Sequence, residues 1–150
     1  MLSVLEIKRK LPEKFVEDLY ENYSPLTVDK ILAGMAGERN TTLRVNRLKS
    51  NIQDIMNCLK ENGIKFDRVL WYSDALILKE ATEKQIQKLD IYENGEIYLQ
   101  SLSSMIPPLV LNPKENEKVL DLTAAPGSKT TQMAAMMNNK GYILANELDG

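Results

Sequence analysis

119-VLDLTAAPGSKTTQM-133 begins as an apolar, strand-like run, turns sharply at Pro126-Gly127 and continues with the spacing of a helix. A second apolar run follows shortly afterwards. We expect a strand, a loop, a helix and a second strand at residues 119–122, 123–127, 128–137 and 142–146. This order predicts a β-α-β unit with parallel strands and a right-handed crossover.

A loop between a strand and a helix commonly holds a phosphate, but this one lacks the required glycines. A P-loop has the pattern G-x-x-x-x-G-K-[ST], whereas here Ser128 separates Gly127 from Lys129, and Leu122 stands near the position of the first glycine. A dinucleotide site has the pattern G-x-G-x-x-G, of which Gly127 alone is present. Both interpretations are therefore disfavoured.

A nucleoside ligand without a phosphate suits the same loop better, because it needs small side chains at the turn and a carboxylate for the ribose. Ala124, Ala125 and Gly127 leave room, and Pro126 stiffens the turn. Acids follow the second strand about 20 residues on, at Glu147 and Asp149. S-adenosylmethionine matches this pattern, and its sulfonium favours a nearby carboxylate such as Asp121. A loop that holds no ligand remains the alternative.

Two short helices are expected at the start of the chain. The first opens at Leu11-Pro12 and places every fourth residue on one face: Leu11, Phe15, Leu19 and Tyr23. Ser24-Pro25 caps the second, which ends at Gly37 and has the inner face Val28, Ile31, Leu32 and Met35.

The next region predicts a small α/β sandwich. We expect strands at residues 41–46, 64–72, 75–79 and 96–99, with capping boxes at Ser50 and Thr82 starting two helices that end at Gly63 and near Leu89. This order is typical of ferredoxin-like domains of the RNA-recognition-motif type, although an unrelated α+β domain can share it. A helix from Leu102, broken at Pro107-Pro108, follows. The predicted domains are residues 1–100 and 101–150, in an α/β chain.

Composition excludes several kinds of chemistry. The chain has 150 residues, one cysteine and no histidine, so Ser-His-Asp triads, Cys-His dyads, histidine metal sites and internal disulfides are excluded. We expect no metal. No apolar run approaches the roughly 18 residues of a membrane span, and the apolar start followed by charge is the reverse of a secretory signal. We therefore expect a cytoplasmic protein that does not contact the membrane.

Cations cluster in one segment although the net charge is −2. Residues 39–53 contain Arg39, Arg44, Arg47 and Lys49 and no acid. A solvated face is one interpretation of this segment. The other is a strip that contacts RNA phosphates.

Cys58 is expected to be structural. A reactive thiol needs a lowered pKa from a helix N-terminus or a basic neighbour. Cys58 lies near the C-terminal end of its predicted helix, where the helix dipole acts in the opposite direction.

The loop 121-DLTAAPGSKT-130 resembles motif I of the Nol1/Nop2/Sun family of RNA cytosine-C5 methyltransferases, which is usually D-x-C-A-A-P-G-G-K-T. It departs at Thr123 and Ser128, and both replacements are small. Three other stretches resemble family signatures and extend the resemblance over residues 11–150: 41-TTLRVNRLK-49, 95-GEIYLQSLSSMIPPLVLNP-113 and 141-GYILANELDG-150.

The resemblance implies a Rossmann-like methyltransferase domain that begins near residue 101, with a cofactor and an RNA substrate. The residues implied to wrap S-adenosylmethionine are Thr123, Ala124, Ala125, Pro126, Gly127, Ser128 and Lys129, with Glu147 on the ribose. Arg44, Arg47 and Lys49 are implied to dock RNA. Ribosomal RNA is the favoured substrate, and transfer RNA is the alternative.

The family's nucleophile is a cysteine thiolate that adds to carbon 6 of cytosine, and a second cysteine assists release. These cysteines lie downstream of the motif at residues 141–150, and Cys58 matches neither. We therefore expect no catalytic residue in this chain, no methyl transfer by it alone, and an origin as the N-terminal portion of a longer enzyme. A non-catalytic RNA-binding fragment is the rival interpretation.

Overall fold

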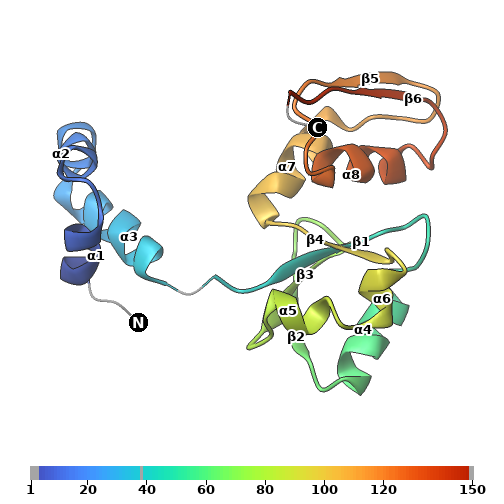
Figure 1. Ribbon diagram of the computed structural model, residues 1–150, viewed down its shortest axis with the longest axis horizontal. Helices are drawn as coiled ribbons and strands as arrows, with labels where there is room; N and C mark the ends of the chain where they lie inside the picture. Colours follow the sequence, from blue (N-terminus) through green and yellow to red (C-terminus); the bar gives the residue numbers. More distant parts are fainter. Residues whose placement is uncertain (1–3, 38, 149–150) are drawn as a thin grey trace. The chain divides into compact units, whose positions relative to one another are not determined.

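The computed structural model describes residues 4–37 and 39–148, and it divides into two compact units at residues 1–39 and 40–150 (Figure 1). Each unit has its own hydrophobic core and is described by itself. The predicted division near residue 100 falls inside the second unit and stays a proposal.

The described residues of the first unit form three helices, α1 (Val4–Lys10), α2 (Glu13–Asn22) and α3 (Pro25–Ala36). The two predicted helices are α2 and α3, and the Ser24 hydroxyl caps α3 by accepting from the Thr27 amide. Ile7, Val28 and Leu32 are buried together as the core of the unit. Helix α1 was not predicted, since seven residues span only about two turns and show little periodicity.

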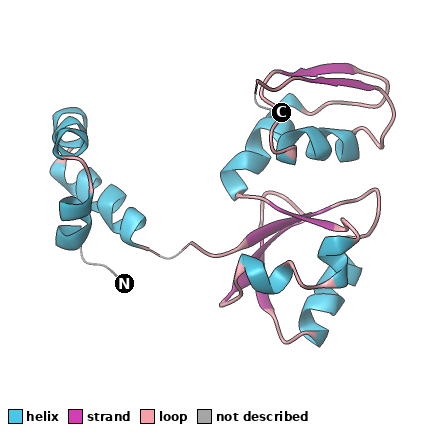
Figure 2. Ribbon diagram, viewed as in Figure 1, coloured by secondary structure: helices cyan, strands magenta, loops and turns pink. Residues whose placement is uncertain are grey.

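The second unit begins with a four-stranded antiparallel sheet (Figure 2), as the strand and helix order predicts. Its strands lie in the order β2-β3-β1-β4, and every neighbouring pair is antiparallel. This is the ferredoxin-like arrangement. Its elements are β1 (Thr42–Val45), α4 (Ile52–Glu61), β2 (Lys65–Arg68), β3 (Ala75–Lys79), α5 (Glu83–Ile86), α6 (Asp90–Glu93) and β4 (Ile97–Leu99).

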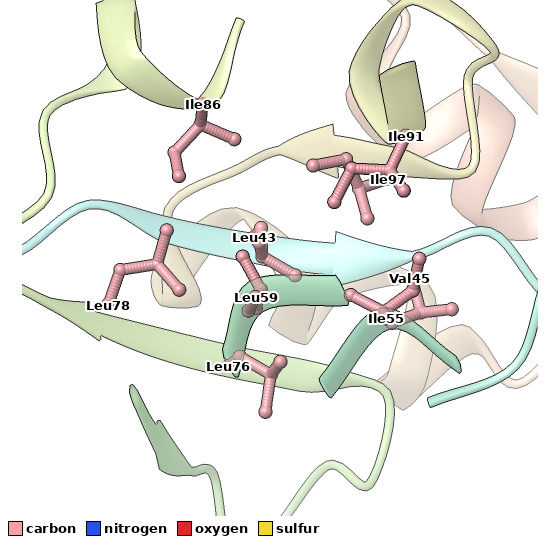
Figure 3. Packing of buried hydrophobic residues seen from close by; sticks show 9 residues of the cluster. All are labelled: Leu43, Val45, Ile55, Leu59, Leu76, Leu78, Ile86, Ile91 and Ile97. Carbon is pink, nitrogen blue, oxygen red and sulfur yellow. The ribbon is translucent and has the colours of Figure 1, made fainter. Parts of the chain in front are cut away.

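One face of this sheet packs against α4, α5 and α6. Alternate residues of the strands point to this face because side chains alternate along a strand. Figure 3 shows the resulting core, formed by Leu43, Val45, Ile55, Leu59, Leu76, Leu78, Ile86, Ile91 and Ile97. Asn62 caps the end of α4, and Gly63 follows with φ +71°, as the predicted helix end requires.

The other face of the sheet is covered as well. Helices α7 (Leu102–Leu111) and α8 (Ser128–Met136) lie between it and a second sheet of β5 (Lys118–Asp121) and β6 (Tyr142–Ala145) (Figure 1). Met105 of α7 is fully buried with Ala75 of β3. This second layer explains why the ferredoxin-like part and the β-α-β unit form one compact unit.

The β-α-β unit has the predicted parallel pairing, with Val119 opposite Ile143 and Asp121 opposite Ala145. Gly141 permits the turn into β6: its φ is +135°, and a Cβ there would lie 2.7 Å from the Glu117 carbonyl oxygen. The outer face of the pair is apolar, as Leu120 is 56% and Leu144 52% exposed.

Several local expectations differ from the structure. Phe15, Tyr23 and Met35, which were expected on inner helix faces, are exposed, and helix α6 was not predicted. Helix α7 continues through Pro107 and Pro108, although these two residues have no N–H group to donate to the Ser103 and Ser104 carbonyls one turn earlier. Asn51, not Ser50, caps α4, and its side-chain oxygen accepts from two backbone amides. The expected strand at residues 64–72 ends at Arg68, since the chain turns at residues 69–72. Among the described helices, none has the length and apolarity to cross a bilayer.

Replacing Leu59 with alanine should lower the free energy of unfolding of the second unit by about 2–5 kcal/mol, because it leaves a cavity in a fully buried position. Urea denaturation followed by the emission of Trp71, the single tryptophan, measures this unit. Leu70→Ala is the matched control, since Leu70 is 100% exposed, and it should change the value by less than about 0.5 kcal/mol. Equal losses in both variants would contradict the assigned core.

Candidate functional site

The turn from β5 into α8 is set by Gly127. This residue is the N-cap of α8 and has φ +97°, a conformation that L side chains rarely adopt. Its amide donates to the Ala124 carbonyl at 2.6 Å, and its carbonyl accepts from the Thr131 amide at 2.9 Å. No atom lies within 4 Å of where a Cβ would stand, so the space over the turn is open.

The base of the loop is held by Asp121, the last residue of β5. Its carboxylate accepts from the Thr130 hydroxyl at 2.6 Å and from the Thr123 amide at 3.4 Å. Asp121 is buried, and it ties the strand to the first turns of α8 across the loop. This carboxylate therefore contributes to the shape of the loop in addition to its charge.

Glu147 lies beside the loop, as its position after β6 predicts. Its carboxylate accepts from the Ala125 amide at 2.9 Å and from the Leu148 amide at 2.8 Å. The neighbouring Ala124 amide donates to the Asn146 carbonyl at 2.9 Å. The structure thus brings the end of β6 to the loop that follows β5. Asp149, the second predicted acid, lies outside the described residues.

The predicted loop residues differ in accessibility. Thr123, Ala125 and Pro126 are exposed, whereas Ser128 is 9% exposed and covered by protein. The remaining three, Ala124, Gly127 and Lys129, are half-buried. A surface of small groups and backbone atoms is therefore open around the turn. The serine that replaces the usual glycine of the family motif is accommodated within the fold.

Arg44 requires a correction. We predicted that it contacts RNA, but the side chain is 1% exposed, on the sheet face that α7 and α8 cover. Its Nε donates to the Gln100 amide oxygen at 2.9 Å and its Nη2 to the Thr131 hydroxyl at 3.1 Å. Burial lowers the pKa of Arg44, and the neighbouring Tyr72, Asp74 and Tyr98 oppose this shift. In this position Arg44 has no access to a phosphate.

Arg47 and Lys49, the other two predicted RNA contacts, lie on the surface. The Arg47 side chain is 63% exposed, and its Nε pairs with the buried Asp74 carboxylate at 2.8 Å. Lys49 is exposed, and its ammonium donates to the Asn94 carbonyl at 2.7 Å. Both cations lie in the exposed segment that follows β1, although their side chains bond to different loops.

Further hydrogen bonds to the loop and helix α8 were not predicted. The Tyr98 hydroxyl donates to the Pro126 carbonyl at 2.9 Å, and the Gln100 amide donates to Gln132 at 2.9 Å. Alternation along residues 97–99 does place Tyr98 on the face opposite Ile97 and Leu99. No sequence signal indicates, however, which residue about 30 positions further along the chain each of these side chains bonds.

Cys58 has the environment of an inert thiol. Burial raises the pKa of the thiol, the carboxylates of Glu61 and Glu96 raise it further, and a weak contact with the Asn62 side chain opposes them. Such surroundings favour the protonated form, which is a poor nucleophile. The prediction that Cys58 is structural is consistent with this environment.

Two family models match the chain. Residues 11–85 match the family described as "Methyltr_RsmF/B-like, ferredoxin-like domain", and residues 108–150 match "16S rRNA methyltransferase RsmB/F". The first match covers half of the chain and ends within the four-stranded sheet domain. The second contains the loop, α8 and β6.

Curated relatives and a solved structure are similar along most of the chain. "Ribosomal RNA small subunit methyltransferase F" of Shewanella oneidensis is 40% identical over 81% of this chain and 26% of its own length. "tRNA (cytosine(49)-C(5))-methyltransferase" of Pyrococcus abyssi is 38% identical over 90% of this chain and 43% of its own. A crystal structure of a methyltransferase homolog protein from Pyrococcus horikoshii has a TM-score of 0.73 and 33% identity, covering 93% of this chain and 49% of that one. The chain thus spans between a quarter and a half of these proteins.

Cys58 should react with 5,5′-dithiobis(2-nitrobenzoate) at pH 7.5 several-fold more slowly than N-acetylcysteine does. The raised pKa leaves less thiolate at this pH, and the half-buried position restricts access. In urea, Cys58 should react at the same rate as N-acetylcysteine. This control shows that the thiol has not been modified beforehand. A native rate above that of N-acetylcysteine would show an activated thiol.

Proposed function

The chain belongs to the RsmB/F methyltransferases of the Nol1/Nop2/Sun family, and from this premise we propose that it carries the cofactor loop and an RNA-binding surface of an S-adenosylmethionine-dependent RNA cytosine-C5 methyltransferase. The observation that carries the proposal is the hydrogen bond from the Ala125 amide to Glu147. This bond sets a carboxylate beside an open turn of small residues, as a nucleoside site requires.

The residues of the loop fit S-adenosylmethionine. The exposed residues Thr123, Ala125 and Pro126 and the open space above Gly127 would take the adenosine and methionine parts, with the half-buried Ala124 and Lys129 beside them and the buried Ser128 beneath. Glu147 would accept from the ribose hydroxyls, and Asp121 would keep a negative charge near the sulfonium. When bound, the cofactor supplies an electrophilic methyl group. The role of the chain is to orient that group and to keep the loop in shape.

Ribosomal RNA is the proposed substrate, and transfer RNA is the alternative. The name of the Shewanella relative supports the first and that of the Pyrococcus abyssi relative the second. Methylation at carbon 5 of cytosine is proposed from the second name and from the family resemblance. Arg47 and Lys49 are proposed to contact RNA phosphates, because both are exposed cations on one segment.

No residue of this chain is proposed as the nucleophile. Carbon 5 of cytosine accepts a methyl group only after a thiolate has added to carbon 6. Cys58 is the single cysteine, its pKa is raised, and it lies on α4, on the sheet face opposite the loop and α8. The second candidate function is an RNA-binding module without cofactor. The raised pKa of Cys58 is compatible with that candidate, and cofactor binding separates the two.

Calorimetric titration with S-adenosylmethionine should show saturable binding that Gly127→Ala weakens by roughly 5- to 30-fold. L residues at positive φ cost about 1–2 kcal/mol, and the free loop relieves this strain by leaving the conformation that binds the cofactor. Gly63→Ala is the matched control: its φ is +71°, and its Cβ would also meet open space, but it lies at the end of α4. It should leave the affinity unchanged. Absence of binding by the unaltered chain would favour the RNA-binding module, and equal affinities of the two variants would contradict the proposed site.

Arg47→Gln with Lys49→Gln should weaken the binding of a fluorescently labelled single-stranded RNA and reduce the salt slope, d log K/d log[salt], by about 1–2. Glutamine keeps a polar group beside the buried Asp74. Lys65→Gln with Lys84→Gln removes the same charge from exposed positions on β2 and α5 and should change the slope far less. Fluorescence anisotropy at several salt concentrations measures both. Equal slopes in the two double variants would assign the effect to net charge.

A further inference from the structure

A continuous chain of buried polar side chains crosses from the four-stranded sheet to α7 and α8. Arg44 of β1 donates to Gln100, and Gln100 donates to Gln132 of α8 at 2.9 Å. Gln132 is fully buried, and its amide donates to the Met105 carbonyl at 2.9 Å. No buried side-chain nitrogen or oxygen among the described residues lacks a partner.

Burying the guanidinium of Arg44 within this hydrogen-bond network costs free energy. Removing a cation from water costs several kcal/mol unless it is well paired. The side-chain groups that accept from Arg44 in the described part of the protein are the Gln100 amide and the Thr131 hydroxyl, both neutral. Packing alone would be served by an apolar residue of similar length. The hydrogen bonds of Arg44 therefore indicate a role beyond packing.

The branch through Gln100 ends on Met105 of α7, but two other contacts of Arg44, with Thr131 and with Tyr98, lead to the loop at residues 123–129. The Thr131 hydroxyl that accepts from Arg44 donates to the Gly127 carbonyl at 2.8 Å. Tyr98 lies directly opposite Arg44 on β4, its ring is 5.8 Å from the guanidinium carbon, and its hydroxyl donates to the Pro126 carbonyl. The two carbonyls that are held belong to consecutive residues, at the point where the chain turns with positive φ.

We propose that Arg44 is a positioning residue for the loop at residues 123–129. Through Thr131 it fixes the Gly127 carbonyl, while Tyr98 fixes the Pro126 carbonyl, so the ferredoxin-like sheet sets the orientation of the turn that receives the cofactor. The proposal rests on the proposed function for the identity of that cofactor. It replaces the predicted RNA contact of Arg44 with a role inside the protein.

A purely structural role for Arg44 is the competing explanation, and the two differ in where they act. A structural role affects the whole second unit, whereas a positioning role affects the loop. Amide hydrogen exchange measured by NMR separates them in a single sample and requires no cofactor. The loop reporters are the amides of Ala125 and Gly127. The reference amides are those of Val45 and Leu78, which bond the carbonyls of Asp74 and Thr41 within the sheet domain.

Arg44→Met should speed exchange at the loop reporters about fivefold, the effect of one lost hydrogen bond, and leave the reference amides within twofold. Thr131→Val, an isosteric change at an exposed residue, should do the same, whereas Thr131→Ser keeps the hydroxyl and should restore the original rates. The double variant Arg44→Met with Thr131→Val should exchange no faster than Thr131→Val alone, since both changes break one path.

The affinity for S-adenosylmethionine, measured by calorimetry on the same variants, should fall by a similar factor and recover in Thr131→Ser. Equal acceleration of loop and reference amides in Arg44→Met would assign Arg44 to overall stability and overturn the proposal. Additive effects in the double variant, or equal rates for Thr131→Val and Thr131→Ser, would also overturn it. Failure of the proposed function has a different signature: the unaltered chain would not bind the cofactor, whatever the exchange rates.

Discussion

Strand β1 is covered on both faces, and the arrangement of residues 40–150 depends on that constraint. Leu43 and Val45 enter the core beneath α4, so the residue between them must point to the opposite face. That residue is Arg44, which is buried and donates to Thr131 of α8. Because alternate residues of one short strand belong to two layers, the ferredoxin-like sheet and the β-α-β unit share a boundary that is partly polar.

The two faces of β1 are stabilised by different physical effects. On the α4 side the contacts are apolar and interchangeable, since many aliphatic side chains of suitable volume fill such a core. On the α8 side Arg44, Gln100 and Gln132 must be oriented, because each hydrogen bond has a direction and a buried polar group without a partner is costly. The polar face therefore fixes the orientation of α8 more narrowly than an apolar contact of the same area would.

Local patterns in the sequence predicted most of the elements, because their causes lie within a few residues. The Thr82 capping box, the Ser24 cap and the alternation along residues 42–45 are of this kind. The proximity of Glu147 to the loop was also predictable, since parallel strands bring their carboxyl ends together. The burial of Arg44 was not, because its partner Thr131 lies 87 residues away and arginine is usually exposed. A run of cations cannot show which of its members points inward.

The net charge of −2 does not prevent this chain from presenting a cationic site, because affinity for RNA depends on local geometry as well as on total charge. The buried carboxylate of Asp74 holds the Nε edge of Arg47 at 2.8 Å while the side chain remains 63% exposed. A guanidinium fixed along one edge presents its remaining donors in a defined direction and loses less rotamer freedom when it meets a phosphate. In the proposed RNA-binding surface, an acid that reduces the formal charge would thereby make its neighbouring cation a better-ordered contact.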